Sequence, residues 1–234
     1  MLRKIFVVFR NLIFRNYRED VLCNVISGEI SKLKIIKEKK TVKILDYGSG
    51  YNPILIRKII KKLSLKYKKT KFKAFCYDFY NKKDLIQMNK SETIKFFNIK
   101  KLSATKMKSF DFCLLSDVLH HIGLENESKI INLVKKLKNK AKILIIKDHF
   151  QYGYFSNLAL KMMDFVGNYG DKVKIPKMYF CETCSEDNIS IKCFDNLIKR
   201  LKMNEKKRIK NKKYYKWYWF YFNSKKLQFI SILK

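Results

Sequence analysis

The segment VKILDYGSGYNP, residues 42–53, has the residue types of a ligand-binding turn. Gly48 and Gly50 can adopt backbone angles that other residues avoid, and they let a ligand approach the main chain closely. A helix that begins directly after such a turn offers unpaired N–H groups. The carboxylate of Asp46, at the end of the preceding apolar run, could accept a hydrogen bond from a ligand's amine. These features predict a cofactor-binding loop.

A second acidic residue, Asp78, ends the next strand-like segment, FKAFCYD. A carboxylate at this point of a Rossmann-like sheet suits a ribose, because it can accept hydrogen bonds from both hydroxyls of the diol. The alternative is that Asp78 is an ordinary turn residue. A nicotinamide dehydrogenase would need the same two features, so the glycine loop alone does not choose between cofactors.

The three histidines of the chain, His120, His121 and His149, each follow a predicted strand. A histidine with a pKa of ~6.5 can remove a proton from an attacking hydroxyl or acidic carbon. We predict that His149 is the base and that Asp148 orients it or contacts the substrate. His120 is a further catalytic candidate, although one of the adjacent histidines is expected only to cap or pack the following helix.

The carboxyl ends of parallel strands share one edge of a sheet, and ligands gather there. Apolar and β-rich segments alternate with helical ones from residue 42 onward, which predicts a Rossmann-like, doubly wound and mostly parallel sheet. The tail predicts a C-terminal antiparallel hairpin. The expected strands are 42–46, 72–77, 93–97, 110–116, 141–147, 214–222 and 227–233, and the expected helices are 54–65, 128–138, 156–166 and 185–201.

The net charge of +33 is large, but it is weaker evidence for binding to polyanions than its size alone would indicate. Most of the 53 basic residues are lysines spread over the whole chain, together with abundant Ile, Asn, Phe and Tyr. This is typical of codon bias and of solvated helix faces, whereas phosphate sites favour arginine. The aromatic tail KKYYKWYWFYF, residues 212–222, could stack on single-stranded bases or form a strand buried on both faces.

The first twenty residues, MLRKIFVVFRNLIFRNYRED, form an amphipathic helical pattern in which Arg3, Arg10, Arg15 and Arg18 share the polar face. Such a helix could pack over the sheet, or it could lie on an anionic membrane surface or over an acidic partner. No apolar run reaches the ~18 to 20 residues that span a bilayer.

The six cysteines occur without a cleavable signal peptide, which predicts a reducing cytoplasm. Cys181, Cys184 and Cys193 have part of the spacing of a zinc site, but no histidine lies near them to complete it. We therefore predict no metal.

The segments LDYGSGYN and FDFCLLSDVLHHI resemble the cofactor loop and the fourth strand of class I S-adenosylmethionine-dependent methyltransferases. The resemblance covers residues 42–150 and implies the class I methyltransferase fold, with S-adenosylmethionine as cofactor. Two positions depart from the family: Asn52 replaces the third glycine, and Asn98 replaces an aspartate near the adenine. The residues that it assigns to the cofactor are Asp46, Tyr47, Gly48, Ser49, Gly50, Asp78, Asn98, Ser116 and Asp117.

The segments IIKDHFQYG, MMDFVGNYG and IPKMYF resemble a bacterial subgroup of type 11-like methyltransferases, related to enzymes that modify quinones and lipids. This resemblance implies that Asp164, Asn168 and Tyr179 line the substrate pocket. The segment around Gly167 could instead be a helix end with that glycine as its cap.

The sequence thus predicts methyl transfer to a small-molecule or lipid-linked acceptor. The alternatives are an RNA methyltransferase and a non-catalytic protein that keeps the fold. The expected organisation is an N-terminal helical segment, 1–40, and one methyltransferase domain, 41–234, with a cofactor half, 41–150, and a substrate half, 151–234. The expected location is the cytoplasm, with peripheral contact at the inner membrane surface as a further option.

Overall fold

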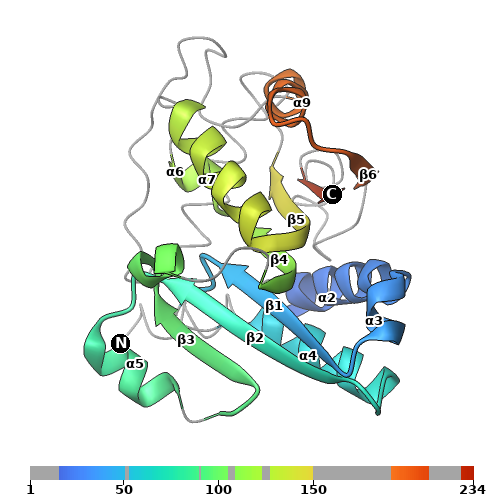
Figure 1. The fold of residues 1–234 in the computed structure, drawn as a ribbon, viewed down its shortest axis with the longest axis vertical. Helices are drawn as coiled ribbons and strands as arrows, with labels where there is room; N and C mark the ends of the chain where they lie inside the picture. The colour runs from blue at the N-terminus through green and yellow to red at the C-terminus, as the bar shows by residue number, and fades with distance from the viewer. Residues whose placement is uncertain are drawn as a thin grey trace. The chain divides into compact units, whose positions relative to one another are not determined.

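The computed structural model describes residues 16–50, 53–89, 91–104, 109–122, 127–149, 191–210 and 228–234. Within these ranges, helices and strands alternate up to β5 (Figure 1). The elements are α2 (Asn16–Ser31), α3 (Lys34–Glu38), β1 (Thr41–Tyr47), α4 (Ile54–Lys66), β2 (Lys71–Asp78), α5 (Lys82–Met88), β3 (Ile94–Asn98), the 3-10 helix η2 (Ile99–Ala104), β4 (Phe110–Ser116), α6 (Leu119–Ile122), α7 (Glu127–Lys140), β5 (Ala141–His149), α9 (Ile191–Arg200), β6 (Glu205–Ile209) and β7 (Gln228–Leu233).

The seven strands form a sheet in the order β3-β2-β1-β4-β5-β7-β6. β1 pairs in parallel with β2 on one side and with β4 on the other, and β2 pairs in parallel with β3. The strand order therefore reverses between β1 and β4, the position where open α/β sheets bind ligands. This sheet confirms the predicted Rossmann-like, doubly wound fold with a C-terminal antiparallel hairpin.

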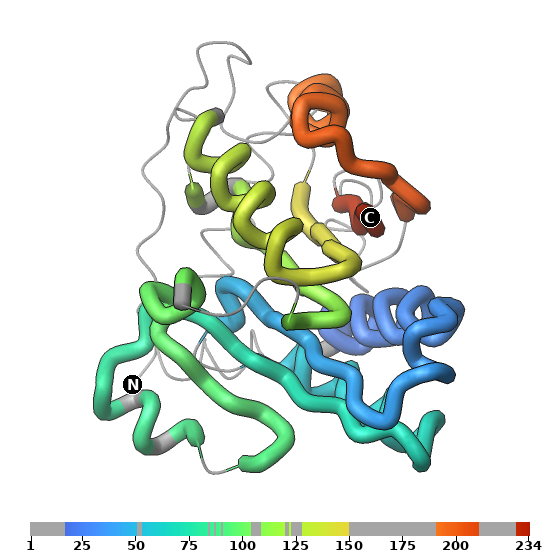
Figure 2. Tube along the Cα trace, viewed as in Figure 1, coloured from blue at the N-terminus to red at the C-terminus, as the bar shows by residue number. Residues whose placement is uncertain are grey.

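The strand register aligns the carboxyl ends of β1, β2 and β3, which lie side by side in Figure 2. Tyr47 is opposite Tyr77, and Asp78 is opposite Asn98. The residues that follow these strands are therefore brought to one edge of the sheet, as parallel pairing requires.

The chain divides into two compact units, within each of which the residues contact one another closely. The first unit comprises Met1–Arg18, Asp117–Leu133 and Lys147–Ser231. The second comprises Glu19–Ser116, Val134–Ile146 and Ile232–Lys234. The glycine loop belongs to the second unit, and the segment with His149 to the first.

Helix α4 shows why the second unit folds as it does. Its buried residues, Ile56, Ile59, Ile60 and Leu63, recur at the spacing of one helix face. The opposite face carries lysines, which keep it in water. In β4, every residue from Phe110 to Leu115 is buried, including Asp111, as expected for a central strand covered on both faces.

All five strands predicted before residue 150 are confirmed, with ends that differ by at most two residues, and so are the helices predicted over 54–65 and 128–138. β7 confirms the strand predicted over 227–233, and α9 is the described part of the helix predicted over 185–201. The predictions over 156–166 and 214–222, and most of the N-terminal amphipathic segment, lie outside the described residues. β6 was not predicted, because its sequence EKKRI has one apolar residue.

None of the helices in the described part of the chain has both the length and the apolar composition that crossing a membrane requires.

Candidate functional site

The glycine loop after β1 has the backbone that its sequence predicts. Gly48 and Gly50 have φ angles of 73° and 68°, in the left-handed region that favours glycine. The N–H of Gly48 donates to the carbonyl oxygen of Tyr77 at 2.8 Å, and the N–H of Gly50 donates to a carboxylate oxygen of Asp78 at 2.7 Å. A Cβ atom added to Gly50 would meet nothing within 4 Å, so the loop borders open space.

Asp46, near the end of β1, is 5% exposed. Burial first, and then the negative charges of Asp78 and Glu19, raise its pKa to about 8. Without a ligand, the neutral acid is therefore favoured at neutral pH. A ligand that brings a positive charge would favour the carboxylate instead.

Asp78 uses both carboxylate oxygens to hold the main chain, since the second accepts from the N–H of Phe79 at 2.6 Å. Each oxygen keeps a further lone pair for a ligand hydroxyl. Phe79 is 72% exposed, unusual for a large aromatic residue, and it directly follows the proposed ribose carboxylate. An exposed ring at this point can stack on a flat ligand.

The structure places Asn98 beside Tyr80. Its side-chain N–H donates to the main-chain oxygen of Tyr80 at 2.7 Å, and its side-chain oxygen accepts from the N–H of Lys100 at 3.0 Å. The amide therefore stabilises the backbone, and its predicted adenine contact would use its remaining N–H. Tyr47 is half-buried, and its pKa is raised by burial and then by Asp78. Ser116, half-buried, ends β4.

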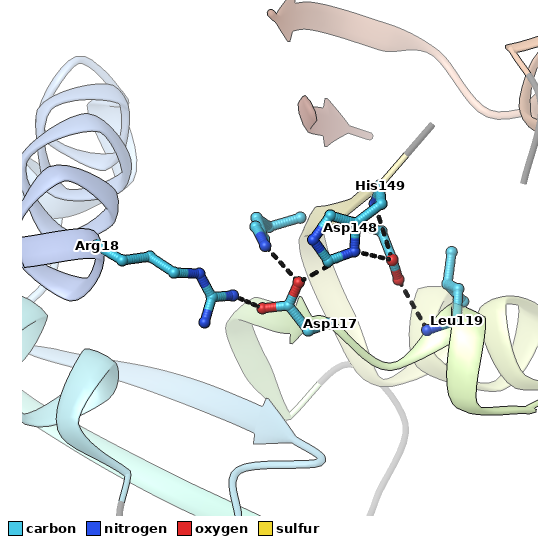
Figure 3. A network of polar contacts seen from close by, with 6 residues as sticks. Arg18, Asp117, Leu119, Asp148 and His149 are labelled. Atoms are coloured by element: carbon cyan, nitrogen blue, oxygen red, sulfur yellow. Dashed lines mark hydrogen bonds and ion pairs between the residues drawn. The ribbon is translucent and has the colours of Figure 1, made fainter. Parts of the chain in front are cut away.

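A network of polar contacts in the first unit connects Arg18 of α2 to the ends of β4 and β5 (Figure 3). Asp117, predicted as a cofactor residue, forms ion pairs with Arg18 and with Lys147. Burial alone would raise the pKa of Asp117, but the positive charges of Arg18 and Lys147 outweigh it and hold that pKa well below its usual range. Asp117 has a φ of 54°, a left-handed conformation that Asp tolerates better than most residues.

Asp148 and His149 lie in the same network at the end of β5 (Figure 3). One carboxylate oxygen of Asp148 accepts from the N–H of Leu119, the first residue of α6, at 2.8 Å. The other lies 3.5 Å from Nδ1 of His149, and Asp117 lies 3.7 Å from the same nitrogen. Two carboxylates therefore face Nδ1.

Asp117, Asp148 and His149 have ligand atoms within 4.8 Å of one another, the spacing of a metal site. The carboxylate of Asp117 already pairs with the cations of Arg18 and Lys147, which a metal would have to displace. Cys193, the described member of the zinc candidates, is disulfide-bonded and has no free thiolate.

Some predicted residues lie outside the described part of the chain. These are Asp164, Asn168 and Tyr179, together with Asn52 of the glycine loop. The backbone of His120 is described in α6, but its side chain is not.

Sequence reasoning missed three residues that the structure brings to these sites. Tyr80 contacts the glycine loop, Arg18 pairs with Asp117, and Glu19 lies near enough to Asp46 to raise its pKa. Of these three residues, only Tyr80 could have been found from the sequence, because it lies two residues beyond the predicted ribose-binding residue Asp78. Arg18 and Glu19 are far from their partners in sequence, and the amphipathic pattern only placed Arg18 on the polar face of the expected helix.

No protein-family model and no curated protein sequence matches the chain. Solved structures are similar in fold. A SAM-dependent methyltransferase from Leishmania major has a TM-score of 0.58 and 9% identity, over 92% of this chain and 72% of that one. 1,6-Didemethyltoxoflavin-N1-methyltransferase from Burkholderia thailandensis has a TM-score of 0.55 and 8% identity, over 92% of this chain and 77% of that one.

A third similar structure, the CurJ carbon methyltransferase, has a TM-score of 0.57 and 9% identity. The alignment covers 90% of this chain and 53% of that one, so this chain spans about half of that structure. These identities establish the fold alone. The protein therefore has the class I methyltransferase fold.

Proposed function

We propose that this protein transfers a methyl group from S-adenosylmethionine to a small-molecule or lipid-linked acceptor. The observation that carries the proposal is the buried carboxylate of Asp46 beside a glycine loop that borders open space. On a class I methyltransferase fold, this combination suits a ligand with an ammonium group. A nicotinamide cofactor brings no ammonium group to satisfy Asp46.

The residues of the second unit match the parts of the cofactor in turn. Asp46 would accept from the ammonium group, and its pKa would fall on binding because the ligand's charge favours the carboxylate. Asp78 has lone pairs left for the ribose hydroxyls. The exposed ring of Phe79 would stack on the adenine, and the open space beside Gly50 would leave room for the ligand.

When bound, S-adenosylmethionine supplies a methyl group activated by its positively charged sulfur. The acceptor's nucleophilic atom would take this methyl group, and the electron pair of the broken carbon–sulfur bond would stay on sulfur. We propose that Nε2 of His149 takes the acceptor's proton. Asp148 and Asp117, which both face Nδ1, would orient the ring and stabilise the imidazolium that forms.

A small acceptor is supported by the Burkholderia thailandensis structure, which contains 1,6-didemethyltoxoflavin with S-adenosylhomocysteine. Nucleic acid as acceptor has support only from the net charge and the aromatic tail. The salt dependence of binding distinguishes a small acceptor from nucleic acid, because binding that neutralises several phosphates weakens steeply as ionic strength rises.

Calorimetric titration with S-adenosylhomocysteine, and with NADH in parallel, tests the cofactor. We expect micromolar binding of the former and none of the latter. Asp46→Asn should abolish or strongly weaken this binding, whereas Asp20→Asn, which changes an exposed carboxylate paired with Lys58, should leave it unchanged. Binding of NADH alone would replace the proposal with a dehydrogenase, and binding of neither would favour a non-catalytic protein.

Two parts of the proposal rest on segments outside the described residues. The acceptor pocket would include Asp164, Asn168 and Tyr179, and the N-terminal segment would contact the inner membrane surface from the cytoplasm. Co-sedimentation with vesicles containing anionic lipid, compared with neutral vesicles, tests the second part. Equal recovery with both vesicle types would remove it.

A further inference from the structure

The end of β2 holds the glycine loop at three points. The main-chain oxygen of Tyr77 accepts from Gly48, and the carboxylate of Asp78 accepts from Gly50. The third point is the hydroxyl of Tyr80, which donates to the main-chain oxygen of Gly50 at 2.6 Å. Both polar groups of the Gly50 backbone are therefore bound by residues that follow one another closely at the end of β2.

The hydroxyl of Tyr80 also lies 2.7 Å from the hydroxyl of Ser49. A tyrosine hydroxyl has a single hydrogen, and here it is donated to the oxygen of Gly50. Ser49 must therefore be the donor in the second contact. This assignment fixes the side chain of Ser49 as well as the Gly50 peptide.

Tyr80 is rigidly placed. It is 1% exposed, and its ring packs edge-on against Phe96 of β3 with the ring centroids 5.8 Å apart. Its main-chain oxygen accepts from Asn98, so its backbone is bound to the end of the same strand. Burial raises the pKa of the hydroxyl well above its usual value, so the group stays a neutral donor.

The rigid placement of Tyr80 matters for ligand binding because the backbone of a glycine-containing loop is otherwise flexible. A loop with Gly48 and Gly50 has many conformations available, and ordering it on ligand binding would cost conformational entropy. A loop already held in one conformation avoids that cost, and the ligand binds more tightly. Tyr80 does this from a buried position, with no need to touch the ligand.

We propose that Tyr80 is a positioning residue for cofactor binding: through Ser49 and Gly50, it holds the glycine loop in the conformation that receives S-adenosylmethionine. This inference rests on the proposed function. It explains why an aromatic hydroxyl is buried beside a loop that a ligand must approach.

Tyr80→Phe tests the proposal, because it removes the hydroxyl and keeps the ring against Phe96. Tyr67→Phe is the matched control. The hydroxyl of Tyr67 donates to the main-chain oxygen of Ser31 at 3.1 Å, a contact of the same kind away from the loop. Both variants lose a hydrogen bond to a carbonyl, so a similar loss of thermal stability is expected from each.

Two measurements separate positioning from general stability. In calorimetry, we expect Tyr80→Phe to weaken S-adenosylhomocysteine binding about tenfold, or ~1.4 kcal/mol, and Tyr67→Phe to leave it unchanged. In NMR of the ligand-free protein, the Gly50 amide should exchange faster with solvent in Tyr80→Phe and not in Tyr67→Phe.

The positioning role is overturned if Tyr80→Phe binds the ligand as the wild type does, or if both variants weaken binding equally. An unchanged Gly50 amide would also overturn it. Failure of the wild type to bind S-adenosylhomocysteine is a different result, because it rejects the proposed function itself.

Discussion

The ammonium of Lys147, a side chain with no exposed surface, forms an ion pair with the carboxylate of Asp117. Burial lowers the pKa of Lys147, as does the nearby charge of Arg18, while Asp117 opposes both effects. The charge of this lysine is favoured mainly by the carboxylate of Asp117, which it shares with Arg18, and to a smaller extent by that of Asp148. Removing the carboxylate of Asp117 should expose most of the cost of the buried cation.

We expect Asp117→Asn to reduce the free energy of unfolding by about 3–5 kcal/mol, because it leaves Lys147 buried without its ion-pair partner. Asn tolerates the left-handed backbone of residue 117, so strain is not the cause. Adding Lys147→Met should restore most of the loss. Urea unfolding measures all three proteins.

The control for this prediction is Asp195→Asn. Asp195 also pairs with an arginine, Arg208, but its side chain is 52% exposed. An exposed pair contributes little, so the loss should be at most about 1 kcal/mol. Equal losses at Asp117 and Asp195 would contradict the importance of burial.

The raised pKa of Asp46 makes stability depend on pH. A carboxyl with a pKa of ~3.9 in the unfolded chain and about 8 in the folded protein binds a proton on folding between these values. Its contribution is complete below pH ~4 and is lost as pH rises toward 8. Relative to Asp46→Asn, the wild type should lose up to ~1.4 kcal/mol per pH unit in this range.

Urea unfolding of both proteins at pH 5, 6.5 and 8 measures this difference. Asn mimics the protonated acid, so the variant should be the more stable protein at pH 8, and the two should be most similar at pH 5. Parallel stabilities at all three values would show that Asp46 is ionised throughout.

At position 50, we expect the left-handed backbone angle of glycine to matter more for the protein's stability than its small size. Gly50→Ala should cost about 1–2 kcal/mol through the left-handed φ, since an added Cβ would meet nothing within 4 Å. Gly50→Asn should cost less, because Asn tolerates this region better. A larger loss for Asn than for Ala would indicate crowding instead.

Gly28 provides a control, because replacing it with alanine should change the stability in the opposite direction. It lies inside α2, and a Cβ there also meets nothing within 4 Å. Because its φ is not in the left-handed region, Gly28→Ala should stabilise the protein by about 0.5–1 kcal/mol through helix propensity. Thermal unfolding of both alanine variants compares the two positions directly.

His149 should carry its proton on Nδ1 when neutral. Both Asp148 and Asp117 face that nitrogen, at 3.5 and 3.7 Å, and their charges favour a proton there. Nitrogen-15 NMR of the imidazole distinguishes the two tautomers, and the chain's three histidines can be assigned with His149→Gln. A proton found on Nε2 would remove His149 as the base.

The sequence by itself determined the local elements and the chemistry of the glycine loop. The apolar segments that became β4 and β5 have the near-continuous hydrophobicity of buried parallel strands, and the buried face of α4 follows from its periodicity. The left-handed backbone of Gly48 and Gly50, and the position of Asp46 near the end of β1, were predictable because they depend on neighbours within a few residues. Backbone angle and strand position are local properties.

Only the tertiary structure decided which distant residues act on these local elements. Arg18 and Asp117 are far apart in sequence, and so are Tyr80 and Gly50, yet each pair is in direct contact. Parallel strand register and helix packing create such contacts, and no short pattern encodes them. For the same reason, the raised pKa of Asp46 and the buried charge of Lys147 could not be predicted: both arise from burial and from charges that the fold brings near.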